Sequence, residues 1–508
     1  MLCSYVALRS RARSSVRERV VHKPVLCEVL WSQDALNEQE GCKRLFGENE
    51  AMIGRTAWVC GVLCVGVLCG CVSTGDMETA GTLAAGEKQL GNKPDRLEWF
   101  QDLGLGMFVH WSVDCPLGVV ISHSMVGASE AYLDRYMQEL PKRFNPTRFD
   151  PDRWAELAHL AGMKYVVFGT KHHSGFCMFE TKTTDFNVMN TPYGQDITRQ
   201  VVDAFRKRHI PVGFYFSPDD FWILRKQGLD ISRRRPAVWP INNPELLAHD
   251  QAQIRELLTN YGPIDIIFLD GPAESSPALR ELCWQLQPNI VVTRGVMETP
   301  EQELPGQPLP GPWEACFTMG NQWQYKPTNE EYKSGTRLIE MLVETRAKSG
   351  NLLLNVGPHP DGVIPLEQEA QLRELALWNF VNGEAVFNTR PWRVTNEGDI
   401  WFTRAKGTDT VYAIVTGGPG WAFGERRTLT IKSVRPSPQS EIEILGQSGR
   451  VIEYRPKVLP KATWKVDVAG LHIIAMRAQR LYNNYKWPNP VVIKITHAQP
   501  AKADETER

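Results

Sequence analysis

Three potentially cationic side chains, Lys171, His172 and His173, directly follow the short apolar run 165–170. This run is rich in β-branched and aromatic residues, which predicts a buried parallel strand. Barrel enzymes and open α/β sheets carry their ligand groups at the C-terminal ends of such strands. The structural alternative is a histidine pair that only hydrogen-bonds a loop. The position at a strand end favours a binding or catalytic site.

Two carboxylates stand at the ends of other apolar runs. Asp270 closes the run 264–270, and Glu314 opens the run 314–319 beside Trp313. Asp270 lies too far from the next expected helix to cap it, and a buried glutamate is costly unless it is used or paired. Glycoside hydrolysis needs two carboxylates, because one attacks the anomeric carbon while the other protonates the leaving oxygen. The pair therefore predicts a site of that chemistry.

The elements that must position these groups alternate between strand and helix. We expect strands at 106–110, 165–170, 212–217, 264–270, 290–294, 314–319 and 352–356. We expect helices at 151–162, 196–208, 244–261, 276–286, 329–349 and 366–381. This alternation predicts an α/β fold, namely a (β/α)8-like, TIM-type catalytic barrel over residues 96–385. Because seven strands are visible, one strand of the barrel is degenerate or missed.

The pattern changes after Asn388, where helical periodicity ends. Short alternating runs follow, separated by Gly, Pro and Asn turns, which is typical of a β-sandwich. We assign residues 386–498 to this C-terminal sandwich. The polar tail 499–508 is expected to be disordered.

The N-terminus contains a predicted export signal. Residues 1–51 are rich in Arg and lack a periodic pattern, so we interpret them as a non-native extension before a true start at Met52. A short basic region and an apolar run then predict a secretory signal that is too short to span a membrane. The alternative is a cytosolic extension with a buried apolar segment.

The end of this signal, Leu68-Cys69-Gly70-Cys71, resembles the lipobox of bacterial lipoproteins. Residues 52–71 are therefore predicted to be a lipoprotein signal peptide, with Cys71 lipidated at the mature N-terminus. Residues 72–95 are small and polar, as a flexible tether would be. We expect an exported protein, periplasmic or anchored to the outer membrane of a bacterium, that meets the membrane only through this anchor.

Composition narrows the partners and cofactors. Lys plus Arg (57) nearly balances Asp plus Glu (58), and no long basic block appears, which argues against nucleic-acid binding. The 16 Trp residues suit a carbohydrate site as well as a core. The cysteines beyond Cys71 show no CxxC or other metal spacing, so we predict no metal and no cofactor. The sequence gives no disulfide pairing among them: Cys115, Cys177, Cys283 and Cys316.

Several motifs occur in one order along residues 97–393. They are Gly106-Met-Phe-Val-His-Trp111, Lys171-His-His-Ser-Gly-Phe176, Phe268-Leu-Asp270-Gly, Trp313-Glu314 and Gly350-Asn-Leu-Leu-Leu-Asn-Val-Gly-Pro358. This series resembles the α-L-fucosidases of glycoside hydrolase family 29. The resemblance implies a retaining enzyme that releases terminal α-linked fucose from fucosylated oligo- or polysaccharides, and the predicted signal makes it an exported one. Two alternatives stay open: a glycosidase for a related sugar such as galactose, and a catalytically silent carbohydrate-binding lipoprotein.

The resemblance also implies roles for individual residues. Asp270 is the expected nucleophile, Glu314 the preferred acid/base and Glu301 the alternative acid/base. Arg294 is expected near the nucleophile, where its charge helps to keep Asp270 ionised. The other expected sugar contacts are His110, Trp111, His172 and His173 for the hydroxyls, and Phe108 and Phe268 for the methyl group.

Two smaller features leave their interpretation open. The run Arg233-Arg-Arg235 is interpreted as a solvated loop, with an anionic contact as the alternative, because short charge runs are usually surface features. Asp219 follows an expected strand, and it suits a turn as well as the wall of a cleft.

Overall fold

A computed structural model describes residues 90–501 of the chain. The predicted extension, the signal peptide, the lipidated Cys71 and most of the tether and tail lie outside these residues. Within the described part, no helix combines the length and apolar character needed to cross a membrane.

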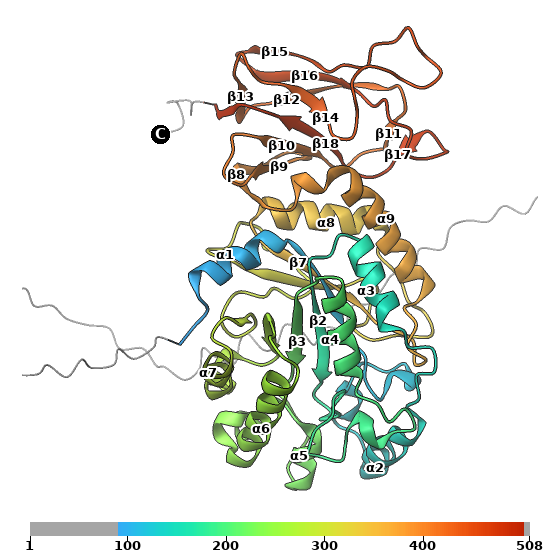
Figure 1. The fold of residues 1–508 in the computed structure, drawn as a ribbon, viewed down its shortest axis with the longest axis vertical. Helices are drawn as coiled ribbons and strands as arrows, with labels where there is room; N and C mark the ends of the chain where they lie inside the picture. The colour runs from blue at the N-terminus through green and yellow to red at the C-terminus, as the bar shows by residue number, and fades with distance from the viewer. Residues whose placement is uncertain (1–89, 502–508) are drawn as a thin grey trace, which may run out of the picture. The chain divides into compact units, whose positions relative to one another are not determined.

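After α1 (Pro94–Leu103), the first sheet of the described part is parallel (Figure 1). Its strands match all seven expected runs. They are β1 (Leu105–Val109), β2 (Tyr165–Lys171), β3 (Val212–Phe216), β4 (Ile266–Leu269), β5 (Val291–Val292), β6 (Glu314–Thr318) and β7 (Asn351–Val356). The order across the sheet is β5-β4-β3-β2-β1-β7-β6. In this list β5 and β6 are the two edges, so the described strands form a half-barrel rather than a closed eight-stranded barrel.

A non-helical segment takes the place of an eighth strand beside β6. The backbone N–H of Glu314 donates to Glu298 O (3.1 Å), that of Cys316 to Pro300 O (3.0 Å), and that of Gln302 to Cys316 O (3.0 Å). Pro300 has no N–H to donate, which keeps this pairing irregular. We call the opening between β5 and β6, together with residues 294–312, the seam.

Helices surround the sheet and include every helical run that the sequence predicts. They are α1 (Pro94–Leu103), α2 (Glu130–Glu139), α3 (Pro151–Leu160), α4 (Ile197–Lys207), α5 (Phe221–Lys226), α6 (Pro244–Asn260), α7 (Pro277–Leu286), α8 (Gly335–Ala347) and α9 (Leu366–Asn382). Several begin at a side-chain cap: Asp150 accepts from Arg153 N and Asp196 from Arg199 N. Such caps satisfy otherwise unpaired amides, typically contributing about 1 kcal/mol each.

Antiparallel sheets follow the half-barrel, as predicted. Their strands are β8 (Thr389–Glu397), β9 (Ile400–Ala405), β10 (Val411–Val415), β11 (Trp421–Ala422), β12 (Arg426–Ile431), β13 (Val434–Pro436), β14 (Ile442–Ile444), β15 (Thr463–Asp467), β16 (Gly470–Met476), β17 (Lys486–Trp487), β18 (Val491–Ile495) and β19 (Ala498–Pro500). The larger sheets have the orders β14-β18-β10-β9-β8 and β12-β16-β15. Helices α8 and α9 lie between these sheets and the parallel sheet in Figure 1.

A buried arginine on α8 ties the two regions together. Arg346 donates to Val386 O (2.8 Å), Gly350 O (2.6 Å) and Gln101 O (3.0 Å). These carbonyls come from the start of the antiparallel region, the loop before β7 and α1. A second bond joins Trp378 Nε1 on α9 to Pro490 O (2.8 Å). The half-barrel and the sheets therefore share one buried, hydrogen-bonded boundary.

The four cysteines of the described residues are all unpaired and buried. Cys177 donates weakly to Gly175 O, and Cys115 to Pro358 O. Burial raises the pKa of the Cys177 thiol well above its ordinary value. These residues act as small apolar core groups.

Candidate active site

A narrow cavity lies at the C-terminal ends of the parallel strands. Its lining comes from six strands or the segments that follow them, and from the loops that carry His123, Arg233 and Trp323. Parallel strands bring their C-terminal ends to the same edge, so residues distant in sequence meet there. The lining residues are Phe108, His110, His123, His172, His173, Tyr215, Arg233, Phe268, Asp270, Arg294, Glu301, Cys316 and Trp323.

Asp270 is the most strongly contacted carboxylate in this cavity. It follows β4, and its Oδ1 accepts from Arg294 Nη1 (2.9 Å) while Oδ2 accepts from Tyr215 Oη (2.6 Å). Arg233 Nη2 lies 3.5 Å from Oδ2. Burial alone would raise the pKa of Asp270, but the charges of Arg294 and Arg233 and the Tyr215 hydroxyl outweigh it and hold the pKa well below its usual range. The side chain is therefore a carboxylate.

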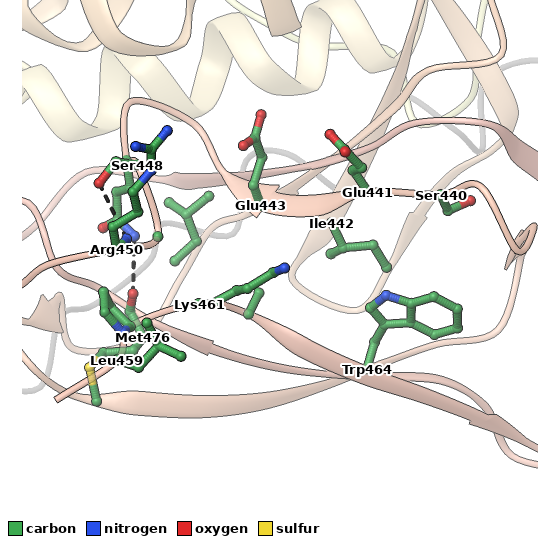
Figure 2. A pocket seen from close by; sticks show the side chains of 15 residues that line it. Ser440, Glu441, Ile442, Glu443, Ser448, Arg450, Leu459, Lys461, Trp464 and Met476 are labelled. Atoms are coloured by element: carbon green, nitrogen blue, oxygen red, sulfur yellow. Dashed lines mark hydrogen bonds between the residues drawn. The ribbon is translucent and has the colours of Figure 1, made fainter.

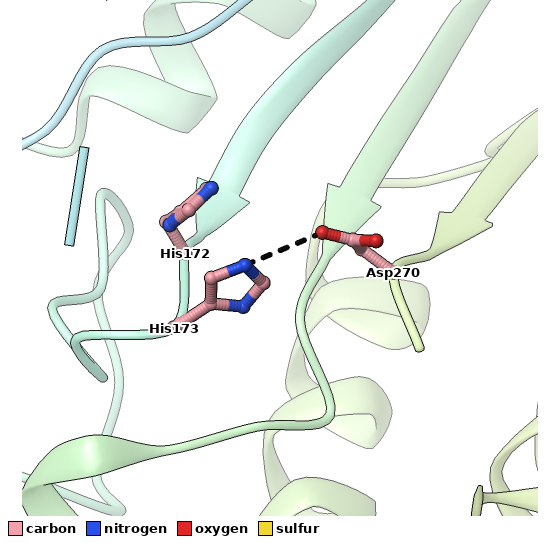
Figure 3. A group of neighbouring side chains, drawn as sticks. All are labelled: His172, His173 and Asp270. Atoms are coloured by element: carbon pink, nitrogen blue, oxygen red, sulfur yellow. Dashed lines mark ion pairs between the residues drawn. The ribbon is translucent and has the colours of Figure 1, made fainter. Parts of the chain in front are cut away.

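The two histidines predicted from the sequence flank this carboxylate. Figure 3 shows His173 directed toward Asp270, with Nε2 3.5 Å from Oδ2, and His172 beside it. One ligand atom from each of these three residues lies within 4.8 Å of the others, close enough for a metal ion. The guanidinium groups of Arg233 and Arg294 disfavour a cation there, because both already direct positive charge at Asp270.

Three imidazoles of the cavity are held through Nδ1 by buried partners. The bonds are His110 to Asn355 Oδ1 (2.7 Å), His172 to Ser122 Oγ (2.9 Å) and His173 to Ser217 Oγ (2.6 Å). Burial lowers the pKa of His110 to about 4 and the pKa values of His172 and His173 well below the ordinary value. All three rings are therefore neutral at pH 7 and suited to hydrogen bonds with hydroxyl groups.

An aromatic wall forms the apolar side of the cavity. Phe108 lies 5.2 Å from Phe268 and 5.9 Å from Trp323, measured between ring centroids. Both Phe108 and Phe268 are buried residues of the interior cluster. This wall suits an apolar part of a ligand, and both predicted phenylalanines belong to it.

Trp111 does not reach the cavity, contrary to the prediction. Its ring packs in the core against Phe144, Phe149 and Trp154, at centroid distances of 5.5, 5.3 and 5.4 Å. The residue follows His110 directly, and adjacent side chains of an extended segment point in opposite directions. His110 therefore faces the ligand space, while Trp111 faces the helices.

Of the two expected acid/base candidates, the structure brings Glu301 to the cavity. Its Oε2 accepts from Arg294 Nη2 (2.9 Å), and the same guanidinium donates to Asp270 through Nη1. Arg294 therefore joins the two carboxylates directly. Glu301 comes from the segment of the seam that pairs with β6, where it bridges to Cys316.

Glu314, the preferred candidate, lies at the opposite end of the sheet. It pairs with Asn351 at the start of β7, and Leu352 in turn pairs with Leu105 at the start of β1. Its side chain is 0% exposed and accepts from Tyr165 Oη. Burial raises the pKa of Glu314 to about 7. The preference for Glu314 therefore conflicts with its position, because Glu314 is not among the residues that line the described cavity.

Arg233 is the main residue of the cavity that the sequence interpretation missed. Its Nε contacts Asp219 Oδ2 (2.6 Å), and its Nη2 donates to the backbone carbonyl of Asp270 (3.3 Å). The prediction of a solvated loop is wrong for Arg233 and fits only its exposed neighbours Arg234 and Arg235. Asp219 is buried in the wall of the site, where burial raises its pKa to about 6 despite the Arg233 contact.

The other missed lining residues are His123, Tyr215, Cys316 and Trp323. Tyr215 had a usable signal, since its position two residues before the end of a predicted strand suits an inward-facing side chain near the site. His123 and Trp323 come from loops without a strand-end signal.

Lys171 has a structural role although it neighbours His172. Its Nζ contacts Asp220 Oδ2 (3.3 Å) and Asp250 Oδ1 (2.8 Å), and all three side chains are fully buried. Asp220 also caps α5 by accepting from Ile223 N. This buried ion cluster supports the end of β2 and leaves the ligand contacts to the two histidines.

A second hollow lies between the edge strands β14 and β15 of the antiparallel region (Figure 2). Trp464 and Lys461 lie on one side of it, and Glu441 and Glu443 on the other. Neither glutamate has an arginine contact like that of Asp270 among the described ion pairs. The hollow therefore lacks the pairing that makes the strand-end cavity suited to catalysis.

Comparisons with known proteins agree with this geometry. The family model described as Alpha-L-fucosidase matches residues 80–384, more than half of the chain. The chain is 27% identical to rat plasma alpha-L-fucosidase over 399 residues, covering 68% of this chain and 82% of that protein. It is 29% identical to mouse tissue alpha-L-fucosidase over 398 residues, covering 69% and 83%.

Solved structures show the same fold. Alpha-L-fucosidase isoenzyme 1 from Paenibacillus thiaminolyticus superposes with a TM-score of 0.62 at 26% identity, covering 79% of this chain and 98% of that one. A trapped covalent intermediate of a GH29 alpha-L-fucosidase from Bacteroides thetaiotaomicron gives a TM-score of 0.64 at 24% identity, covering 81% and 98%. The half-barrel, its strand-end cavity and the family match lead to one conclusion: this chain belongs to the alpha-L-fucosidase family.

Proposed function

We propose that the protein is a retaining α-L-fucosidase that hydrolyses terminal α-linked fucose from glycans through a covalent fucosyl-enzyme intermediate. The observation that carries this proposal is the carboxylate pair at the cavity, in which Arg294 contacts both Asp270 and Glu301 at 2.9 Å. Retaining glycosidases need their two carboxyl groups close together, roughly 5–5.5 Å apart. A shared guanidinium contact keeps such a pair close.

In the first step, an Asp270 oxygen attacks the anomeric carbon and the glycosidic C–O bond breaks. Glu301 gives its proton to the leaving oxygen, so the aglycone departs as a neutral alcohol. The low pKa of Asp270 keeps the nucleophile ionised.

In the second step, water attacks the anomeric carbon of the fucosyl ester. Glu301, now a carboxylate, takes a proton from that water, and the bond between the sugar and Asp270 breaks. Two inversions at one carbon leave the released fucose with its original configuration.

The neutral imidazoles of His110, His172 and His173 bind the sugar hydroxyls in this proposal, and their Nδ1 bonds fix their orientation. The wall of Phe108 and Phe268 covers the methyl group. Galactose carries a hydroxymethyl group at that position, and the wall provides an apolar surface without a partner for its hydroxyl. This contrast favours fucose over galactose.

Trapping the nucleophile tests the proposal. We expect 2-fluoro-fucosyl fluoride to inactivate the enzyme and to add one fluorofucosyl mass to the peptide that contains Asp270, with no labelling of Asp270→Asn. An aryl α-fucoside should be cleaved with a kcat/KM at least tenfold above that of the matching galactoside. NMR should show α-fucose as the first product. Turnover by Asp270→Ala at the wild-type rate would refute the assignment.

We further propose that the protein is exported and anchored through a lipid on Cys71. The support is the sequence 68–71 and the apolar run before it, all outside the described residues. Mass spectrometry of the protein from its native membrane should give a mature chain that begins at an acylated Cys71. An intact N-terminus at Met1 would contradict this proposal.

A further inference from the structure

We propose that the seam holds the leaving-group side of the substrate and that it selects a neutral oligosaccharide of at least two sugars. This inference rests on the proposed fucosidase activity and adds the class of glycan that the enzyme accepts. The seam contains a groove of about 990 Å³. That volume is at the upper end of ligand sites, roughly 300–1,000 Å³, so it exceeds what a single small group requires.

The groove adjoins the catalytic cavity. Glu301 lines both, and Gly271, the residue directly after the nucleophile Asp270, lines the groove. The acid must contact the leaving oxygen, so the aglycone begins beside Glu301. The remainder of the glycan then has a direct path into the seam.

The local sequence keeps the groove open. Its walls come from the turn after β5 (Gly295, Val296 and Met297) and from the segment before β6 (Pro310, Gly311 and Pro312). Apart from residues 310–312 themselves, no described atom lies within 4 Å of the position that a Cβ on Gly311 would take. Glycine and proline leave backbone exposed here, and Val296 remains 41% exposed. Sugars can lie on such a mixed surface, with apolar faces on Val296 and hydroxyls on the backbone.

The charges of the groove are all of one sign. Glu298, Glu301 and Glu303 line it, while Lys, Arg and His are absent from the described lining. Glu298 and Glu303 have no ion-pair partner among the described residues and are exposed to a ligand. A sulfate or uronate on the sugar next to fucose would meet these negative charges, while the nearby Arg294 already pairs with Asp270 and Glu301 and Arg280 donates to the Ala273 carbonyl. The groove therefore favours uncharged glycans.

Another hollow, in the half-barrel, is a competing location for the leaving-group sugars and provides a matched control. It lies between the loops that carry His123 and Arg233, has a volume of about 550 Å³, and includes Val126, Arg225 and Arg235. This hollow shares no lining residue with the described catalytic cavity. Val126 is 47% exposed, close to the 41% of Val296, so tryptophan at either position adds similar bulk.

The test compares two variants on three substrates. Val296→Trp and Val126→Trp would be assayed on an aryl α-fucoside, on a neutral fucosylated trisaccharide, and on the same trisaccharide sulfated on the sugar next to fucose. We expect the ratio of trisaccharide to aryl-fucoside kcat/KM to fall at least tenfold in Val296→Trp and to stay within twofold in Val126→Trp. The wild type should prefer the neutral trisaccharide to the sulfated one at least tenfold.

A third variant, Glu303→Lys, changes the charge of an exposed side chain without adding a bulky ring. It should raise kcat/KM for the sulfated trisaccharide at least threefold relative to the neutral one. A fall of the ratio in Val126→Trp but not in Val296→Trp would overturn the proposal, as would equal use of both trisaccharides by wild type and Glu303→Lys. Absence of aryl-fucoside turnover in the wild type would instead refute the fucosidase activity itself.

Discussion

Two buried carboxylate–tyrosine pairs stand at opposite ends of the parallel sheet. Beyond the end of β4, Asp270 accepts from Tyr215 Oη, and at the start of β6, Glu314 accepts from Tyr165 Oη. Both carboxyl groups are shielded from solvent, with Asp270 8% and Glu314 0% exposed. Their ionisation nevertheless differs, since the pKa of Asp270 lies well below its usual range and that of Glu314 is raised to about 7.

Direct contact with guanidinium groups accounts for this difference. Asp270 touches Arg294 and lies close to Arg233, whereas Glu314 has no arginine within ion-pair distance among the described residues. Burial therefore dominates at Glu314 and raises its pKa, while the two cations prevail over burial at Asp270. A tyrosine hydrogen bond alone does not keep a buried carboxylate charged. The difference in pKa therefore distinguishes Asp270, which suits a nucleophile, from Glu314, which has a structural role.

Removing the nucleophile should have the largest effect. We expect Asp270→Gly to lower kcat on an aryl α-fucoside by about 10⁴-fold or more, because no other group forms the covalent intermediate. Azide added to this variant should give a fucosyl azide of inverted configuration, since it attacks in place of Asp270. The stereochemistry of the azide product, measured by NMR, checks the role. Near-normal hydrolysis by Asp270→Gly would show that Asp270 is not the nucleophile.

Replacing the acid should have the next largest effect. Glu301→Ala should lower kcat/KM by about 10²–10⁴-fold on substrates with poor leaving groups and by much less on activated aryl fucosides. Azide should rescue it and give a product of retained configuration, because the fucosyl ester on Asp270 still forms. Glu314→Ala should show neither response. The reverse pattern would return the acid/base role to Glu314.

Arg294 allows the electrostatic explanation to be tested by pH. Activity needs ionised Asp270 and falls as acid protonates it, so the low pKa places the acidic limb of kcat/KM at low pH. Arg294→Met removes a cation and raises that pKa, which should move the acidic limb upward by about one pH unit or more. Arg294→Lys keeps a charge and should shift the limb less. Equal profiles for all three proteins would show that Arg294 does not control Asp270.

Glu314→Gln should leave catalysis within about threefold of wild type but change stability with pH. The folded-state pKa of Glu314, about 7, exceeds its ordinary value of 4.5. Its stabilising contribution is therefore complete below about pH 4.5 and is lost as pH rises through 7, a span of about 3 kcal/mol. Denaturant unfolding at pH 5 and 8 should show a smaller difference in Glu314→Gln than in wild type. The exposed Glu303→Gln serves as the control.

Much of this arrangement was predictable from the sequence. The seven strand runs are apolar and bounded by turns, so local patterns located them. Asp270, His172 and His173 followed from their places at or after strand ends, whereas Arg294 was expected from the family resemblance. The choice between Glu301 and Glu314 also had a usable signal. Glu314 begins a strand, whereas ligand groups of parallel sheets follow strand ends. Giving this rule more weight would have favoured Glu301.

Other features depend on contacts that no local pattern encodes. Arg233 sits in an ordinary charged run, and only the fold places it against Asp219 and the Asp270 carbonyl. Trp111 shares a motif with His110 but packs on the other side of the chain. The sequence pattern did not predict the seam, because residues 298–302 contain Pro300 and pair with β6 irregularly. Long-range pairing determines these positions.

The four buried cysteines of the described residues have a consequence for redox chemistry. Disulfide exchange needs an accessible thiolate, and each of these thiols is buried, with burial raising the pKa values of Cys115, Cys177, Cys283 and Cys316. Cys115, Cys177 and Cys283 therefore offer thiol oxidants and reductants little to act on, and Cys316 is approached only from the cavity that it lines. The catalytic region should keep its melting temperature and activity in the presence or absence of a thiol reductant.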